Sequence, residues 1–144
     1  VSDPMRGEWF EARAAAGLLR GGSGSNHPPG SDASVVALSH RWRSHHSGWR
    51  RHFPDPIKVR AVGSIALEMA WIATGRLAAG AWYRTNPWDV TAGELLIRES
   101  GGLVVEVPDG GPGERWALSR SALFLRQAFL ASSDGKAATG SNSP

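Results

Sequence analysis

From residue 57 onward, short apolar runs alternate with polar, glycine-containing breaks, which predicts alternating strands and helices. Residues 57–62 alternate apolar and basic side chains, as a strand does. Residues 64–74 are apolar around most of a helical surface, so this segment predicts a buried helix that ends at Gly75. Alternating strands and helices favour an α/β fold, in which a mixed sheet and flanking helices form layers.

The other runs extend this pattern along the chain. Residues 39–53 combine arginines and histidines with two tryptophans, and they predict a loop with a short helix. Further strands are predicted at 8–13, 34–38, 79–83, 103–107 and near 129–131, and a second helix is predicted at 89–100.

Two stretches rich in glycine and serine interrupt the predicted fold. Residues 21–32 predict a surface loop, and residues 132–144 predict a disordered tail. One domain over residues 1–131 is therefore expected, and a chain of 144 residues is long enough to build a hydrophobic core. Because the first residue is Val1, we expect the chain to begin inside a longer protein or at an unusual start codon.

Composition narrows the class of protein. Hydrophobic residues make up 41% and charged residues 20%, which is typical of a folded domain. The absence of cysteine excludes disulfides and thiolate chemistry, and it makes a cytoplasmic location the default expectation. No apolar run approaches the ~20 residues that span a membrane. The net charge is +3, and most basic residues are arginines, which suit an anionic substrate.

A first candidate site lies where the strand at 57–62 meets the following helix. Gly63 lets a ligand approach the backbone, and helix N-termini offer unpaired N–H groups with a partial positive charge. Ser64 can cap the helix or donate to an oxygen. Such a turn can hold a phosphate or a sugar hydroxyl, although ordinary strand–helix packing explains most turns of this kind.

A second candidate site is the segment 86–93, at the start of the second predicted helix. Asp89 stands where a helix favours a carboxylate, Trp88 is expected to anchor the turn, and small residues at 91–93 allow close packing. A carboxylate fixed in this way can bind Mg²⁺, although on its own an aspartate here is more often a plain helix cap.

Taken in order, the two motifs resemble the inositol monophosphatase family. The helix start at 63–67 has the family's Gly-Ser/Thr-x-Ala-Leu pattern, and residues 88–93 have its Trp-Asp-x-x-Ala-Gly pattern. A Gly-Arg turn at 75–76 and a Glu-x-Gly-Gly helix end at 99–102 complete the match. Residues 3–12 also resemble the hairpin that follows the family's central active-site segment.

This resemblance implies a layered α–β sandwich of the sugar-phosphatase type, of which the chain forms the C-terminal half. It implies Mg²⁺-dependent hydrolysis of a phosphate monoester, with metal ions that activate water and polarise the phosphoryl group. Asp89 matches a metal-ligand aspartate. Gly63, Ser64, Ile65 and Asp89 match residues that contact substrate, and family members suggest a homodimer.

Part of the family's pattern is missing. Neither its Asp-Pro-x-Asp-Gly-Thr segment nor its upstream glutamate is present, and Arg6 and Lys58 replace the second carboxylate in two look-alike segments. Two adjacent dications need several anionic ligands. We therefore assign no catalytic residue and expect little or no activity from this chain alone. The alternative is a non-catalytic, truncated phosphatase module that acts in oligomerisation or regulation.

Substrate choice also departs from the family. Trp82 stands seven positions before Asp89, where many members carry an acidic residue that binds a polyol hydroxyl. Inositol phosphate itself is therefore disfavoured. Inositol-phosphate-like, sugar-phosphate, histidinol-phosphate and nucleotide-type monoesters all remain open.

The segment 40–52 offers two competing interpretations. His45, His46 and His52 suggest a metal site, whereas the arginines with Trp42 and Trp49 suggest nucleic-acid binding. Adjacent histidines on a helix point their rings to different sides, and no nucleic-acid motif accompanies the arginines. We therefore interpret this segment as a solvated surface and expect neither a nucleic-acid nor a membrane partner.

Overall fold

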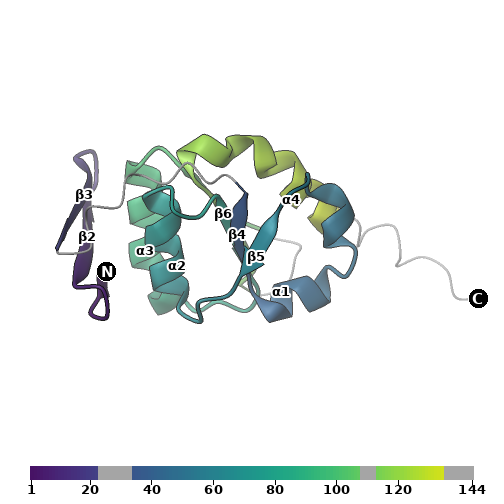
Figure 1. Cartoon of the computed structure of the whole chain (residues 1–144), viewed down its shortest axis with the longest axis horizontal. Coiled ribbons are helices and arrows are strands. Elements are labelled where there is room, and N and C mark those ends of the chain that lie inside the picture. The colour runs from purple at the N-terminus through teal and green to yellow at the C-terminus, as the bar shows by residue number, and fades with distance from the viewer. Residues whose placement is uncertain (23–33, 108–112, 135–144) are drawn as a thin grey trace, which may run out of the picture.

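Two sheets and the helices between and beside them make up the computed structural model, which describes residues 1–22, 34–107 and 113–134 (Figure 1). The smaller sheet has three antiparallel strands in the order β1-β2-β3, and the larger has five strands in the order β5-β4-β6-β8-β7. The strands are β1 (Ser2–Asp3), β2 (Glu8–Arg13), β3 (Gly17–Gly22), β4 (Val35–Leu38), β5 (Lys58–Arg60), β6 (Ala79–Trp82), β7 (Leu103–Glu106) and β8 (Arg115–Leu118).

The larger sheet is mixed. Strands β5, β4 and β6 run parallel, while β8 lies antiparallel to both β6 and β7. This arrangement confirms the predicted α/β class with a mixed sheet and flanking helices. The helices are α1 (His40–His45), α2 (Ile65–Ala73), α3 (Pro87–Glu99) and α4 (Arg126–Asp134), with 3-10 turns η1 (Trp49–His52) and η2 (Arg120–Leu125).

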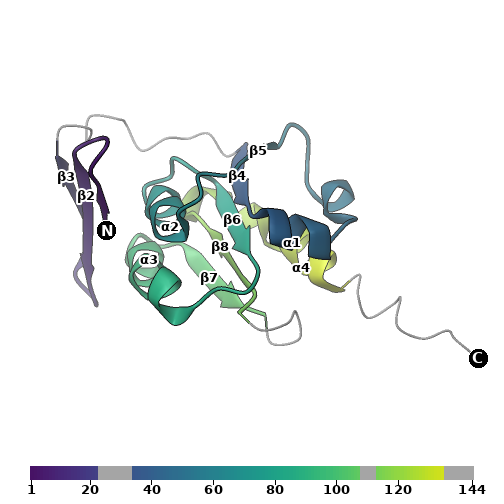
Figure 2. The same cartoon turned by 90° about the horizontal axis from the view of Figure 1, so that it is seen from below.

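The elements form successive layers, which Figures 1 and 2 show from two directions. Helices α2 and α3 lie between the three-stranded sheet and the five-stranded sheet, and α1 and α4 cover the far face of the five-stranded sheet. Alternation along each strand separates the two faces: Val36 and Leu38 join the cluster of Trp42 and Phe129, whereas Ala37 joins the cluster of Met69. The layered order therefore follows from the two-residue period of the strands.

Glycines set the ends and the spacing of the two central helices. Gly75 and Gly101 have φ of 75° and 81°, a left-handed conformation that ends α2 and α3 where the sequence predicted. A Cβ on Gly93 would lie 2.5 Å from the Cβ of Met69, so α3 approaches α2 closely only because this position is glycine.

Ion pairs as well as apolar contacts hold the three-stranded sheet against the layer of α2 and α3. Phe10 packs against Ala70 and Leu96. The buried carboxylate of Glu8 accepts hydrogen bonds from Arg76, one of them at 2.7 Å, and from Arg20 at 3.3 Å. These arginines hold the pKa of Glu8 below its ordinary value of 4.5, because they stabilise the charged carboxylate.

A second contact between the smaller sheet and the helical layer lies at the C-terminal end of α3. The carboxylate of Glu99 accepts backbone hydrogen bonds from Ala15 at 3.0 Å and Gly17 at 2.9 Å, which lie in and just after the β2–β3 turn. The N–H groups of Gly17 and Ala15 lower the pKa of Glu99. Glu99 belongs to the Glu-x-Gly-Gly motif, so this motif joins the smaller sheet to α3.

Three expectations about secondary structure need correction. The strand predicted near 129–131 is wrong, because these residues belong to α4, where Ala128, Phe129 and Ser132 are buried at helical spacing. Strands β3 and β8 were not predicted, and β8 lies inside the larger sheet.

The first residues of the predicted loop and of the predicted tail belong to regular elements instead. Gly21 and Gly22 complete β3, and residues 132–134 complete α4. The rest of both segments lies outside the described residues. Within the described ranges, no helix is both long and apolar enough to cross a bilayer.

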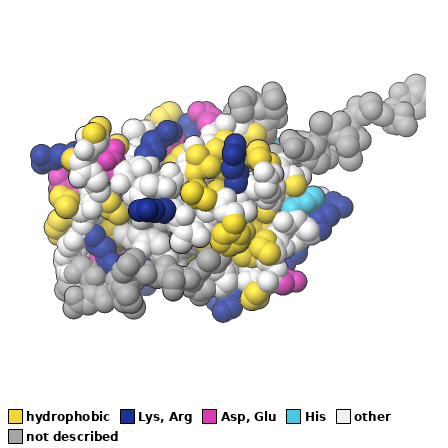
Figure 3. All heavy atoms as spheres, turned by 90° about the horizontal axis from the view of Figure 1, so that it is seen from above, with side chains coloured by type: hydrophobic (Ala, Val, Ile, Leu, Met, Phe, Trp, Pro, Cys, Tyr) yellow, Lys and Arg dark blue, Asp and Glu magenta, His cyan; other side chains and the backbone are white. Residues whose placement is uncertain are grey.

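The face formed by η2 and α4 carries hydrophobic side chains between scattered basic ones (Figure 3). Leu123 and Phe124, both in η2, are among the exposed large hydrophobic residues of the chain.

Candidate active site

Three neighbouring strands end at the same edge of the larger sheet. Because β5, β4 and β6 are parallel and adjacent, their carboxyl ends lie together, and each leads into the start of a helix. After β4 the chain turns to the face that carries α1, whereas after β5 and β6 it turns to the face of α2 and α3 (Figure 2). Ligands of open α/β sheets bind in the crevice that such a divergence opens.

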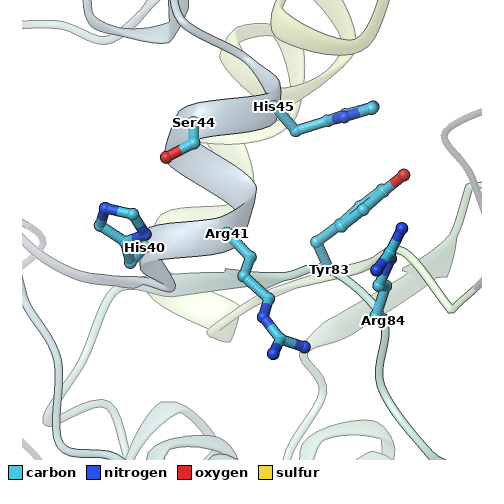
Figure 4. Close-up of a pocket in the computed structure, with 6 residues that line it drawn as sticks. All are labelled: His40, Arg41, Ser44, His45, Tyr83 and Arg84. Carbon is cyan, nitrogen blue, oxygen red and sulfur yellow. The ribbon is translucent and has the colours of Figure 1, made fainter.

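The described residues form a crevice at this edge. One hollow of about 300 Å³ is lined by residues at the ends of all three strands. An adjoining hollow of about 450 Å³, shown in Figure 4, shares His40, Arg41, Tyr83 and Arg84 with it. The first hollow is lined by Ser39, His40, Arg41, Ala61, Gly63, Ile65, Glu68, Trp82, Tyr83 and Arg84.

Glu68 fixes the turn between β5 and α2. Its buried Oε1 accepts hydrogen bonds from the backbone N–H of Val62 at 2.7 Å and of Gly63 at 3.4 Å. Its Oε2 accepts from the indole N–H of Trp82 at 2.7 Å. One carboxylate therefore joins the turn after β5 to the last residue of β6, and both of its oxygens are occupied.

The four predicted substrate-contacting residues divide into two pairs. Gly63 and Ile65 line the hollow. Gly63 has φ of 89°, and an added Cβ there would meet nothing within 4 Å, so the backbone conformation alone requires glycine. Ser64 and Asp89 do not line it: the Ser64 hydroxyl caps α2 by accepting from Leu67 N–H at 3.4 Å.

Asp89 lies half-buried in the first turn of α3, at the same edge of the sheet. Its Oδ2 accepts a hydrogen bond from Asn86 Nδ2 at 3.3 Å. Trp88 is 79% exposed, so the expectation that it anchors this turn is wrong.

A magnesium site needs more ligands than the described residues supply around Asp89. Mg²⁺ requires near-octahedral oxygen coordination, and a two-metal site needs several carboxylates. Among the described residues, Asp89 belongs to no group of three side chains that could hold a metal ion. The described residues around Asp89 therefore do not form such a site by themselves.

The crevice is lined by two arginines without an acidic partner. Arg41 and Arg84 are exposed, and neither forms an ion pair in the part of the chain that the structure describes. The guanidinium of Arg84 lies 5.8 Å from the centre of the Tyr83 ring. Two unpaired guanidinium groups in one crevice make it attractive to an anion.

The sequence did not single out Glu68, Arg41 or Arg84. Glu68 carried a signal, because it is the only carboxylate in an otherwise apolar helical run. Arg41 belongs to the basic segment 40–52, which we interpreted as a solvated surface, and Arg84 carried no signal. Only the order of the strands brings these two residues together at the ends of β4 and β6.

Comparison with known proteins agrees with this architecture. The model of the Inositol monophosphatase family matches residues 1–141. The chain is 31% identical over 122 residues to the Escherichia coli K12 protein named Nus factor SuhB, a match that covers 76% of this chain and 44% of that protein. It is 40% identical over 79 residues to the inositol-1-monophosphatase of Mesorhizobium japonicum, which covers 51% of this chain and 29% of that enzyme.

A solved structure shows the same arrangement of elements. The inositol monophosphatase from Anabaena superposes with a TM-score of 0.64 at 26% identity, over 90% of this chain and 56% of that one. The chain thus spans about half the length of the proteins that it matches. The ordered motifs, the layered fold and the family match together place this chain in the inositol monophosphatase family.

Proposed function

We propose that this chain is the substrate-recognising, C-terminal portion of a Mg²⁺-dependent phosphomonoesterase. The observation that supports this proposal best is the crevice at the carboxyl edge, where the Gly63 turn and two unpaired arginines line one hollow. Family membership supplies the reaction class.

Each residue has a distinct role in this proposal. Asp89 would provide one carboxylate to a Mg²⁺ ion, which would supply Lewis-acid activation of the phosphoryl group when bound. Ile65, the first residue of α2, has a backbone N–H without a helical acceptor, and it would donate to a substrate oxygen. Glu68 would hold the turn that carries Gly63 in place.

Activity needs further carboxylates from residues outside this chain. One aspartate cannot bind two dications, so the isolated chain is proposed to be inactive. The matched regions cover 44% and 29% of the two relatives, which leaves room for such residues in the remainder of those proteins.

The residues that line the crevice favour substrates with two anionic groups among the four candidate types of phosphate monoester. Trp82 stands at the position of the family's acidic residue, and an indole only donates a hydrogen bond, here to Glu68, so Trp82 offers no acceptor to a polyol hydroxyl. Arg41 and Arg84 would attract a second anionic group and repel an amine. A nucleotide-type or doubly anionic sugar phosphate is therefore favoured over inositol phosphate or histidinol phosphate.

Two forms of the protein test this proposal. The isolated chain, assayed for phosphate release with Mg²⁺ and a panel of these four substrate types, should give no turnover. A chimera in which the chain follows the N-terminal portion of the Mesorhizobium japonicum relative should release phosphate, and Asp89→Asn should abolish the release. Turnover by the isolated chain, or a chimera indifferent to Asp89→Asn, would contradict the assignment.

A non-catalytic module is the second candidate, because one similar relative is named a Nus factor. The outer side of the smaller sheet exposes Trp9 and Leu19, and Met5 is exposed in the turn between β1 and β2. These side chains would suit a protein contact such as a homodimer. Light scattering on the wild-type chain and a Trp9→Glu variant would test this contact. Dimers that persist in the variant would exclude this surface. A cytoplasmic location and the absence of a nucleic-acid partner stay predictions.

A further inference from the structure

A cluster of three potential metal ligands, two of them buried, lies beside the crevice and has no part in the proposed function. His45 and His46 come from the end of α1, and Glu114 directly precedes β8. One potential ligand atom from each lies within 4.8 Å of the others. We propose that these three residues bind one divalent transition-metal ion, for which Zn²⁺ is the best fit.

The two histidines come together because the helix ends between them. The sequence predicted that adjacent rings would diverge on a helix, and this prediction is wrong here. His46 has φ of −111° and ψ of 63°, which is not helical. Its ring meets that of His45 edge-on, with the ring centres 4.9 Å apart.

The hydrogen bonds of His46 require a cation next to its second nitrogen. Nδ1 lies 3.0 Å from the backbone carbonyl oxygen of Ser132, and because a carbonyl only accepts, Nδ1 carries the hydrogen. In the neutral ring Nε2 then presents a lone pair, 2.8 Å from the carboxylate Oε1 of Glu114. Two acceptors at this distance repel each other unless a proton or a metal ion joins them.

Glu114 points to the same conclusion independently. Its side chain is fully buried, and Oε1 also accepts from the indole N–H of Trp42 at 3.1 Å. Its Oε2 is buried and has no hydrogen-bond partner among the described residues. A buried carboxylate oxygen without a partner is costly, and a coordinated cation would satisfy it.

The donor set and geometry favour Zn²⁺ over Mg²⁺. Two imidazoles with one carboxylate suit Zn²⁺, whereas Mg²⁺ prefers oxygen ligands alone. Two ligands of a tetrahedral Zn²⁺ at about 2.0–2.1 Å lie roughly 3.3 Å apart, so the His46–Glu114 pair needs only a small opening. Ligand histidines usually donate their other N–H to a carbonyl, as His46 does to Ser132.

His45 completes the set and gives the ion a route in. Its ring is half-buried and stacks on Tyr83 with the ring centres 4.3 Å apart, and one of its nitrogens lies within 4.8 Å of the ligand atoms of His46 and Glu114. It also lines the 450 Å³ hollow, where Figure 4 shows it beside Tyr83. An ion can therefore enter from the crevice without unfolding the core.

The test uses the purified 144-residue chain after chelator treatment. Co²⁺ serves as a coloured probe, because a tetrahedral site with nitrogen ligands gives it strong visible absorption. We expect one Co²⁺ per chain, displaced by Zn²⁺ but not by Mg²⁺, and a melting temperature that rises with bound metal.

Variants distinguish binding at this cluster from binding to scattered surface histidines. His45→Asn changes a half-buried residue and should weaken Co²⁺ binding by about tenfold or more without unfolding the chain. Glu114→Gln should abolish the tetrahedral absorption. The control His52→Asn, outside the cluster, should bind Co²⁺ as the unmodified chain does.

Two results would overturn the proposal. A chain that shows no tetrahedral Co²⁺ absorption would leave His46 and Glu114 as a proton-bridged pair. Equal weakening by His52→Asn and His45→Asn would show surface binding without a defined site. Neither result bears on phosphate release by the chimera, so the two proposals fail separately.

Discussion

The arginines of the three-stranded sheet form ion pairs, whereas, within the part of the chain that the structure describes, the arginines of the crevice at the carboxyl edge do not. In the sheet, Arg20 and Arg76 both contact the buried carboxylate of Glu8. In the crevice, Arg41 and Arg84 form no ion pair among the described residues. The same side chain therefore acts as a structural fastener in one region and is left available to a ligand in the other.

This contrast separates stability from binding. Removing a carboxylate from a satisfied, buried pair leaves uncompensated charge, so the cost falls on folding. Removing an exposed, unpaired arginine costs folding almost nothing, so its effect should appear only with a ligand present. The following predictions test this division, from the largest effect on stability to the smallest.

The largest effect is expected from Glu8→Ala. It leaves Arg20 and Arg76 without their shared partner at the base of the smaller sheet, and the free energy of unfolding should fall by about 3–5 kcal/mol. Urea denaturation measures this change. Glu11→Ala removes an exposed pair with Arg13 and should cost less than about 1 kcal/mol. Equal losses in the two variants would refute a fastening role for Glu8.

Glu68→Gln should have the next largest effect. A glutamine cannot accept from both Trp82 and the backbone N–H of Val62, so one buried donor is left unsatisfied, at about 1–3 kcal/mol. Trp82→Phe removes one donor instead. A double-mutant cycle between the two positions should give a coupling energy above about 0.5 kcal/mol, and strict additivity would show that the bond contributes nothing.

Acid should loosen the smaller sheet before the larger one. The pKa of Glu8 is lowered in the folded chain, so its stabilising effect is complete above the ordinary value of 4.5 and is lost as pH falls through the lower folded pKa. The lowered pKa of Glu99 acts in the same direction. As the pH is lowered, the backbone amides of β2 should lose their protection from hydrogen exchange before those of the larger sheet. In Glu8→Gln, the protection of the β2 amides should depend less on pH.

The smallest effect on stability is expected from Arg41→Ala combined with Arg84→Ala. The free energy of unfolding should change by less than about 0.5 kcal/mol. Binding of a doubly anionic sugar phosphate, followed by calorimetry, should nevertheless weaken several-fold. Arg51→Ala, an exposed arginine that does not line the crevice, is the matched control. Unchanged binding in the double variant would remove the case for an anion site.

Secondary structure was predicted best from the sequence where the apolar period and the glycines that end helices indicate the same boundaries. The strands and helices between residues 57 and 107 follow clear periods, and the two helices end at glycines, so the predicted order of these elements is confirmed. The strand predicted near 129–131 was wrong because a short apolar run does not distinguish a strand from a buried helical turn. Ala128 and Ser132 are both buried, and their spacing of four residues is that of one face of a helix.

The candidate site was only partly predictable for a different reason. Gly63 and Ile65 belong to a contiguous motif, so the sequence could identify them before the fold was known. Arg41 and Arg84 lie in separate segments that the parallel pairing of β4 with β6 brings together. A pocket assembled from several strand ends depends on strand order, which no local pattern encodes.

Helix α3 has one end in each of the two compared regions. It begins with Asp89 in its first turn and ends at Glu99, which grips the β2–β3 turn. Its 13 residues span about 20 Å, and a helix of this length moves as a rigid rod. A lengthened or shortened β2–β3 turn would therefore tilt the helix and displace the Asp89 carboxylate at its far end. Under the proposed function, a change in this distant hairpin would then alter Mg²⁺ affinity without altering the residues that line the crevice.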